Sequence, residues 1–391
     1  MNFSLIEDLQ CPACGTRYPA TLIQTVCLVE TCKSSLFASY SLPLGLKPEV
    51  LLAARPSTMW RYHEFLPVVN PAHIVTLGEG FTPMLPLKNL NFEGGDNEVI
   101  WKDESGNPTG SFKARGISAA VSKAKELGIT NIVTPTAGNA GGALAAYCAQ
   151  GGLNAFVYMP KLTPKVFKDE CRLYGAQLVE VDGNISDCGK LAEKDALENG
   201  WFQVSTLKEP YRLEGKKTMG YEIAEQLNWE LPDVIFYPTG GGTGLIGIWK
   251  AFDEMEKLGW IGSKRPRMVT VQSMSCDGIT QAFHHQQLSA QFVDNGFTIA
   301  NGLRVPKPYA DKLILKVLRE SAGTAISISD QEMEAALKEI ARKEGMLIAP
   351  EGAALWEAFK KLKASDWIMP GEKILLLNTG NGYKYLENIN I

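Results

Sequence analysis

Short runs of apolar residues along the chain alternate with longer stretches in which apolar positions recur at helical spacing. The runs are typical of buried strands, and they predict strands at 99–101, 131–134, 155–158, 177–181, 202–205, 234–237, 268–271, 324–328 and 374–377. The stretches predict helices at 48–66, 111–127, 139–150, 163–174, 185–198, 213–227, 245–258, 331–343 and 352–362. Apolar strands that are joined by helical crossovers predict parallel sheets with helices on both faces.

The composition is that of a soluble globular protein. The chain has 391 residues, of which 45% are hydrophobic and 21% are charged, so we expect more than one domain with a large core. The net charge is −4 and no basic block stands out, which argues against a nucleic-acid partner. We also find no signal peptide and no apolar run that would span a membrane, so a cytoplasmic protein is expected.

Four of the eight cysteines cluster near the start of the chain. Cys11 and Cys14 are separated by two residues in a knuckle-like turn, and Cys27 and Cys32 follow with a wider gap. Four thiolates on two tight turns match a structural zinc site, and the scattered remainder does not resemble a secreted disulfide framework. We therefore predict a small zinc ribbon here, while four reduced cysteines without metal remain the alternative.

One lysine occupies an unusual position. Residues 106–110 are rich in turn-forming types, Ser111 is a plausible N-cap, and Lys113 then falls in the first helical turn. The helix dipole disfavours a cation there and so favours the neutral amine, which is the nucleophile that a Schiff base requires. Lys113 is thus a candidate to carry a carbonyl cofactor, and an exposed lysine in water is the alternative.

Glycine-rich loops follow two of the predicted strands. Residues 239–244, Thr-Gly-Gly-Gly-Thr-Gly, follow the most apolar strand and open a helix, which is typical of a phosphate-binding turn. The loop at 136–142 contains Asn139, a candidate donor to a cofactor or substrate oxygen, although a plain tight turn would also explain it. Gly242–Gly247 spells GxGxxG, but the next strand ends without an acid, so a dinucleotide is not favoured.

A third loop at 379–382, Thr-Gly-Asn-Gly, places a hydroxyl at the C-terminal end of strand 374–377. Such a hydroxyl, held by glycine turns, would bond a ring nitrogen, although a plain turn is again the alternative. One nucleophilic lysine, one phosphate loop, one asparagine loop and one hydroxyl loop together match the needs of pyridoxal 5′-phosphate.

These motifs resemble those of the fold-type II pyridoxal-phosphate enzymes, and most closely those of threonine synthases. The resemblance covers nearly the whole chain and is carried by the segments 77–83, 107–113, 137–140, 212–218, 240–244 and 379–382. It implies a lyase that converts O-phospho-L-homoserine and water to L-threonine and phosphate in amino-acid biosynthesis. A homodimer and an N-terminal ribbon, which some threonine synthases carry, are also implied by the resemblance.

The resemblance implies roles for individual residues. Lys113 would bind the cofactor and move protons, Phe112 would pack near the ring, and Asn139 would bond the ring oxygen. Arg212 would bind the substrate phosphate, and Thr136 and Ala137 would lie beside the substrate. The implied ligands of the cofactor phosphate and ring nitrogen are Gly240, Gly241, Gly242, Thr243, Gly244 and Thr379.

Several positions depart from the family pattern. Ala114 replaces a frequent aspartate, Ala137 and Ala140 replace hydroxyl-bearing residues, and Glu209 replaces the asparagine of a usual Asn-Pro pair. These changes fall where the substrate would be held, so they leave the cofactor chemistry intact and the substrate open. A threonine or serine ammonia-lyase or a β-replacement synthase is the alternative; only the threonine synthase needs a second anion site, from Arg212 with Lys216 or Lys217.

The expected fold class is α/β, with two doubly wound parallel-sheet domains after the cysteine-bearing ribbon. We expect the ribbon at 1–45, a large cofactor-binding domain at 46–116 with 207–391, and a small domain at 117–206. The cofactor is expected between the two α/β domains.

Overall fold

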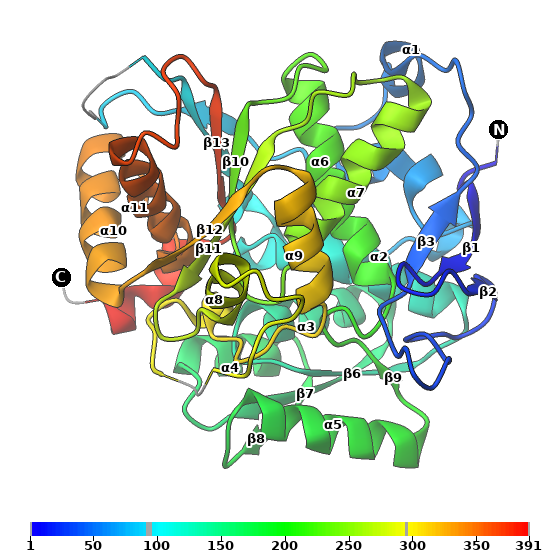
Figure 1. Ribbon diagram of the computed structural model, residues 1–391. Coiled ribbons are helices and arrows are strands. Elements are labelled where there is room, and N and C mark those ends of the chain that lie inside the picture. Colours follow the sequence, from blue (N-terminus) through cyan, green and yellow to red (C-terminus); the bar gives the residue numbers. More distant parts are fainter. Residues whose placement is uncertain (1, 91–95, 294–295, 390–391) are drawn as a thin grey trace. The chain divides into compact units, whose positions relative to one another are not determined.

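The computed structural model describes residues 2–90, 96–293 and 296–389 (Figure 1). The chain divides into two compact units. One comprises Met1–Phe81, Asn107–Tyr221 and Lys257–Trp260, and the other comprises Thr82–Gly106, Glu222–Glu256 and Ile261–Ile391. No helix in these described ranges is long and apolar enough to cross a membrane.

The predicted α/β class with parallel sheets is confirmed, and three sheets are present in the described ranges. The first is an antiparallel ribbon of β1 (Ile6–Gln10), β2 (Arg17–Pro19) and β3 (Phe37–Tyr40), in the order β2-β1-β3. This ribbon carries the cysteines near the start of the chain. It lies in the first compact unit together with the second sheet.

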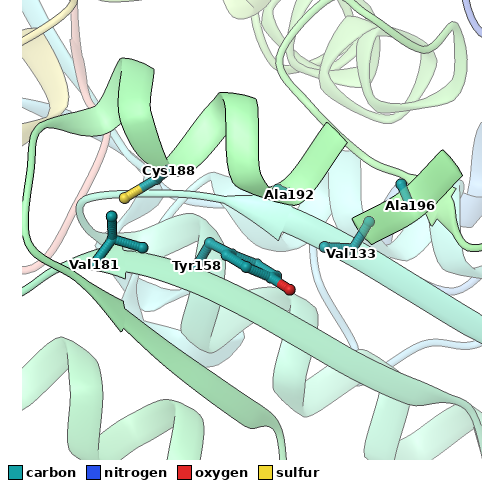
Figure 2. Packing of buried hydrophobic residues seen from close by; sticks show 6 residues of the cluster. All are labelled: Val133, Tyr158, Val181, Cys188, Ala192 and Ala196. Carbon is teal, nitrogen blue, oxygen red and sulfur yellow. The ribbon is translucent and has the colours of Figure 1, made fainter. Parts of the chain in front are cut away.

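The second sheet is fully parallel and has the strand order β8-β7-β6-β9. Its strands are β6 (Asn131–Pro135), β7 (Asn154–Pro160), β8 (Gln177–Val181) and β9 (Phe202–Gln203). Helix α5 (Ile185–Asn199) lies along one face, while α3 (Asn139–Gly151) and α4 (Lys165–Leu173) lie on the other (Figure 1). Small residues of α5 allow it to pack closely on the strands, with Ala192 and Ala196 facing Tyr158 and Val133 (Figure 2).

The third sheet belongs to the second unit and has the order β12-β11-β10-β13-β5-β4. Only β4 (Met84–Pro86) runs antiparallel, against β5 (Val99–Asp103). The other strands are β10 (Val234–Pro238), β11 (Arg267–Ser273), β12 (Thr324–Ile328) and β13 (Ile374–Asn378). Strands β10 and β13 are buried along their whole length, because helices cover both faces, as their continuous apolar sequences predicted.

The helices of the second unit flank this sheet. Helix α11 (Pro350–Ala364) contacts β10 to β13 and packs on α10 (Asp330–Glu344), and Figure 1 shows α8 (Gly278–His284) and α9 (Asp311–Glu320) on the other side. Helix α7 (Thr243–Leu258) follows β10. Helices α8 and α9 were not predicted from the sequence.

Helices α2 (Lys113–Glu126) and α6 (Tyr211–Gln226) lie close to the predicted boundaries, but the predicted helix at 48–66 is wrong. The chain forms α1 (Pro48–Leu52) and then, after a break, a 3₁₀ helix at Met59–Phe65. Pro56 explains the break, because a proline disfavours helical backbone in the preceding residue, and Ala54 has a φ of +60°. The predicted core residues there, Trp60, Phe65 and Leu66, are buried.

The parallel sheet β8-β7-β6-β9 lies within the predicted small domain at 117–206. The predicted domain boundaries themselves stay a prediction.

Candidate active site

Lys113 is the first residue of α2, as the turn chemistry before it predicted. Thr109 and Gly110 both adopt left-handed backbone, with φ values of +59° and +65°, which is rare for a β-branched residue such as threonine. The Asn107 side chain holds the turn by accepting a hydrogen bond of 3.0 Å from the Gly80 amide. Strained backbone that its surroundings enforce is typical of functional sites.

The predicted N-cap differs by one residue. Ser111 has extended backbone, and Phe112 occupies the cap position without a side-chain cap. The Ser111 hydroxyl still accepts a hydrogen bond of 3.4 Å from the Lys113 amide. The left-handed pair before Ser111 shifts the helix start, and the lysine remains in the first turn.

Glycines let α2 and α6 pack backbone to backbone. A Cβ atom at Gly116 would lie 2.7 Å from the Arg212 carbonyl oxygen and 3.2 Å from Cε of Lys216. A Cβ atom at Gly215 would lie 2.0 Å from the Arg115 carbonyl oxygen. No side chain fits at either contact, so this close crossing brings the charged residues of α6 next to Lys113.

Two amines lie on one aromatic ring as a result. The Nζ atoms of Lys113 and Lys216 are each 4.5 Å from the centroid of the Phe112 ring. Phe112 therefore contacts the predicted cofactor lysine and a second lysine that the sequence left undecided. An aromatic face attracts an ammonium group, but it cannot replace the hydrogen bonds that water would give.

Buried charges surround this pair. Glu209, Arg212 and Lys216 each expose 2% or less of their surface. The Glu209 carboxylate accepts hydrogen bonds from the backbone amides of Tyr211 (2.7 Å) and Arg212 (3.1 Å), so it caps the start of α6. Burial raises the pKa of the Glu209 carboxyl to about 7, although the cations nearby oppose this rise.

The cations of the cluster have few partners. Burial lowers the pKa of Arg212. Burial and the nearby charges of Lys113 and Arg212 hold the pKa of Lys216 well below its usual range. The Arg212 Nη1 atom donates to the Val204 carbonyl at 3.2 Å, and no hydrogen-bond partner of its Nε is found among the described residues.

The structure distinguishes Lys216 from Lys217, between which the sequence did not decide for the second anion site. Lys217 Nζ pairs with the Glu214 carboxylate at 2.7 Å and lies 4.0 Å from the centroid of the Tyr40 ring. Its charge is thus already balanced. Lys216 has no ion pair or hydrogen bond in the part of the chain that the structure describes, so it is the lysine available to a ligand.

The asparagine loop lies at the start of α3, next to the lysine turn. Helix α3 packs on α2 and contacts the turn Pro108–Gly110. Asn139 is the first residue of α3, directly after Gly138. The Thr136 hydroxyl accepts a hydrogen bond of 3.2 Å from the Gly138 amide and so shapes the loop that contains Ala137. The first unit thereby assembles the lysine, the asparagine and the cation cluster.

The glycine loop in the second unit has the shape of an anion site. A Cβ atom at Gly240 would lie 2.1 Å from the Gly302 carbonyl oxygen, and one at Gly244 would lie 2.0 Å from the Tyr237 hydroxyl. Gly242 has a φ of +76°. Helix α7 begins at Thr243, whose buried hydroxyl has no hydrogen-bond partner within the described residues. The N-terminus of this helix and the open hydroxyl fit a phosphate group.

The hydroxyl loop lies beside the glycine loop in the same unit. Strands β10 and β13 are parallel neighbours, so the loops that follow them meet at one edge of the sheet. Thr379 directly follows β13 and is buried. Asn378 Nδ2 donates to the Asp103 carboxylate at 2.7 Å, which anchors the start of this loop to β5. A phosphate site and a neutral hydroxyl at one edge fit a phosphate-bearing pyridine ring.

The four N-terminal cysteines come together as predicted. The Sγ atoms of Cys11, Cys14, Cys27 and Cys32 all lie within 4.8 Å of one another. Two Sγ–Sγ distances, Cys11–Cys32 and Cys14–Cys27, are 3.5 Å. Four sulfurs around zinc at about 2.3 Å are separated by about 3.8 Å, so the cluster is close to the size of a tetrahedral site.

Sequence reasoning missed the role of Glu209. It recorded this residue only as a departure from a family pattern, and the structure shows a buried carboxylate that caps α6 beside two cations. The Glu-Pro pair before a helix was the available signal, because an acid there can accept from the first amides of the helix.

A comparison with family models finds one that covers most of the chain. The model described as "Pyridoxal-phosphate dependent enzyme" matches residues 75–380. This range includes every predicted cofactor residue and leaves out the cysteine ribbon.

Relatives with similar sequences cover almost the full length. A threonine synthase of Methanocaldococcus jannaschii is 34% identical over 380 residues, which is 96% of this chain and 92% of that protein. A threonine synthase of Methanosarcina acetivorans is 32% identical over 95% of this chain and 91% of that protein.

Solved structures with similar folds are more distant in sequence. A diaminopropionate ammonia lyase from Escherichia coli has a TM-score of 0.69 at 20% identity, covering 81% of this chain and 88% of that chain. A pyridoxal 5′-phosphate-dependent aspartate racemase has a TM-score of 0.66 at 21% identity, and the match covers 77% of this chain and 90% of that chain. These likenesses show the fold.

Proposed function

Because this chain belongs to the threonine synthase family of pyridoxal-phosphate-dependent enzymes, we propose that it converts O-phospho-L-homoserine and water to L-threonine and phosphate. The observation that carries this proposal is the pair Lys113 and Lys216 on the Phe112 ring, next to buried Arg212. A cofactor lysine needs one amine. The further buried cations suit a substrate that brings a phosphate of its own.

The residues present fit the cofactor. Gly240, Gly241, Gly242, Thr243 and Gly244 would hold its phosphate, for which the Thr243 hydroxyl is open. Thr379 would face the ring nitrogen and Asn139 the ring oxygen, with Phe112 beside the ring. The bound cofactor supplies an electron sink that makes the protons of the substrate acidic.

Lys113 is the proposed base and acid of the reaction. Its position in the first turn of α2 favours the neutral amine, which can accept a proton from the substrate and return it. A hydroxyl at the ring nitrogen keeps that nitrogen less charged than a carboxylate would. Water has to be excluded until it adds at the β-carbon, and we assign that task to closure around the substrate.

Arg212 is the proposed ligand of the substrate phosphate. Its buried guanidinium donates from Nη1 to the Val204 carbonyl, and Nε has no partner in the described part of the chain, so Nε is available to a ligand. Thr136 and Ala137 would lie beside the amino-acid end of the substrate. Ala137 and Ala140 offer no hydroxyls there, so the loop would hold the substrate through backbone amides and Thr136.

The alternative is a threonine or serine ammonia-lyase, or a β-replacement synthase. These reactions use the same cofactor residues but no substrate phosphate. The buried Arg212 and Lys216 favour a phosphorylated substrate. The alternative is favoured by the departures from the family pattern, at Ala114, Ala137, Ala140 and Glu209.

Phosphate release from O-phospho-L-homoserine by the cofactor-loaded protein tests the proposal, with threonine measured in the same tube. We expect equal amounts of both products, and loss of both in Lys113→Ala. A normal cofactor spectrum without phosphate release would exclude the threonine synthase reaction. Serine, threonine and their O-acylated relatives would then be tested for elimination.

We also propose a structural zinc ion at Cys11, Cys14, Cys27 and Cys32, which the size of the cluster supports. We propose a cytoplasmic homodimer, as the family resemblance implies. The domain division into 1–45, 46–116 with 207–391, and 117–206 is likewise proposed.

A further inference from the structure

Lys216 is a buried amine that the proposed cofactor chemistry does not use. It exposes 1% of its surface, and its Nζ lies 4.5 Å from the centroid of the Phe112 ring. Its Cε packs over Gly116, where a Cβ atom would lie 3.2 Å away. The amine has no ion pair or hydrogen bond to any described residue. Burial therefore removes the hydration of the ammonium form without replacing it, and this favours the neutral amine.

The charges that face Lys216 come from two helices. Lys113 lies on α2, and Arg212 and Glu209 lie at the start of α6. Arg212 opposes a proton on Lys216, as Lys113 does whenever its amine is charged, and the Glu209 carboxylate favours one. An added anion at this place would reverse the balance, because it attracts a proton to the amine.

The Arg212 side chain gives independent support for an anion site. Its Nε is buried and has no hydrogen-bond partner among the described residues. A buried guanidinium with an open donor is costly unless a ligand completes its hydrogen bonds. Lys217, the neighbouring lysine, shows no such need, because Glu214 already balances its charge.

We propose that Lys216 is a second ligand of the substrate's phosphate group, beside Arg212, and that it takes up a proton when this dianion binds. The inference rests on the proposed function and specifies its anion site. The proton comes from solvent and forms an N–H bond on the Lys216 amine. The resulting ammonium then pairs with the phosphate oxygens.

Calorimetric titration of the cofactor-loaded protein with inorganic sulfate tests the inference. Sulfate is a dianion that carries no titratable proton near neutral pH, so any proton uptake belongs to the protein. Titrations at about pH 8 in two buffers with different ionisation enthalpies give the number of protons taken up. We expect about one proton per bound sulfate in the unaltered chain.

Three variants identify the group that takes up the proton. Lys216→Arg carries a permanent charge, so we expect it to bind sulfate without proton uptake. Lys216→Met keeps the length of the side chain, and we expect at least tenfold weaker binding without uptake. Lys208→Met removes a partly exposed lysine as the matched control, and we expect unchanged binding and uptake.

Two results would overturn the inference. Proton uptake that persists in Lys216→Arg would assign the proton to another group, with Glu209 the first candidate. Absence of sulfate binding in the unaltered chain, with a normal cofactor spectrum, would exclude the anion site. This titration does not measure threonine formation, so its outcome is independent of the activity assay. If the chain binds sulfate with proton uptake but makes no threonine, the proposed reaction is rejected and the anion site is retained.

Discussion

The carbonyl oxygen of Arg212 lies 2.7 Å from the point where a Cβ atom of Gly116 would be. Helices α2 and α6 can therefore approach this closely because residue 116, like residue 215 on the other helix, is glycine. This contact sets the distance between the proposed cofactor lysine on α2 and the cation cluster on α6. The chemistry of the site thus depends on a residue that has no functional group.

Gly116→Ala is expected to lower the free energy of unfolding by about 1–3 kcal/mol, because the added methyl group forces the two helices apart. Urea unfolding of the cofactor-free protein measures this. Gly189→Ala in the middle of α5 is the matched control, since a Cβ atom there meets nothing within 4 Å, and we expect it to be stabilised slightly. Equal effects of the two substitutions would contradict the close crossing.

Thr243→Val tests the phosphate loop. Valine keeps the shape of threonine and removes a buried hydroxyl without a described partner, so the cofactor-free protein should be as stable as before or slightly more stable. Cofactor affinity should fall about tenfold, because one hydrogen bond to phosphate is lost. Equilibrium dialysis with pyridoxal phosphate measures the affinity, and Thr243→Ser should restore it. Undiminished affinity in Thr243→Val would rule out the hydroxyl as a ligand.

Glu209 should make stability depend on pH. Burial raises the pKa of its carboxyl from 4.5 to about 7, so between these values the folded chain keeps a proton that the unfolded chain has released. The stabilising contribution is fully present below the lower value and is lost as the pH rises towards the upper one. The free energy of unfolding should fall by up to about 1.4 kcal/mol per pH unit in this range.

Glu209→Gln should remove this dependence, because the amide does not titrate. Urea unfolding at several pH values, expressed as the difference between the variant and the unaltered chain, isolates the contribution of this one group. Glu230→Gln, at an exposed position, is the control that should leave the pH dependence of the free energy of unfolding unchanged. If the free energy of unfolding depends on pH in the same way in all three proteins, the Glu209 carboxyl has the same pKa in the folded and unfolded chain.

The ribbon should contain about one zinc ion per chain when the protein is purified without chelator. Cys14→Ser should lose the metal and lower the thermal stability of the ribbon, because binding and folding of such sites are coupled. Cys188→Ala, outside the cluster and on the buried face of α5 (Figure 2), should keep the metal. Metal analysis decides the question, and a zinc content far below one per chain in the unaltered protein would reject the site.

Local sequence determined most of the elements and the chemical character of the loops. Apolar runs gave buried strands such as β10, because a strand covered on both faces needs no polar side. The Thr-Gly-Gly-Gly-Thr-Gly loop predicts an anion site from local sequence alone, because the backbone amides of a glycine-rich turn before a helix point towards a ligand. The predicted helix at 48–66 was wrong, because Pro56 disfavours helical backbone at Arg55 and Ala54 adopts a left-handed conformation.

Only the tertiary structure decided which buried charged side chains have an ion-pair partner among the described residues and which do not. In the sequence, Lys216 and Lys217 are equivalent neighbours. In the fold, Lys217 meets Glu214 and Tyr40, whereas Lys216 meets the Phe112 ring that Lys113 also contacts. The physical reason is that adjacent residues of a helix point about 100° apart, so their surroundings depend on what packs against each face. Burial and pairing are properties of that packing, and no local pattern contains them.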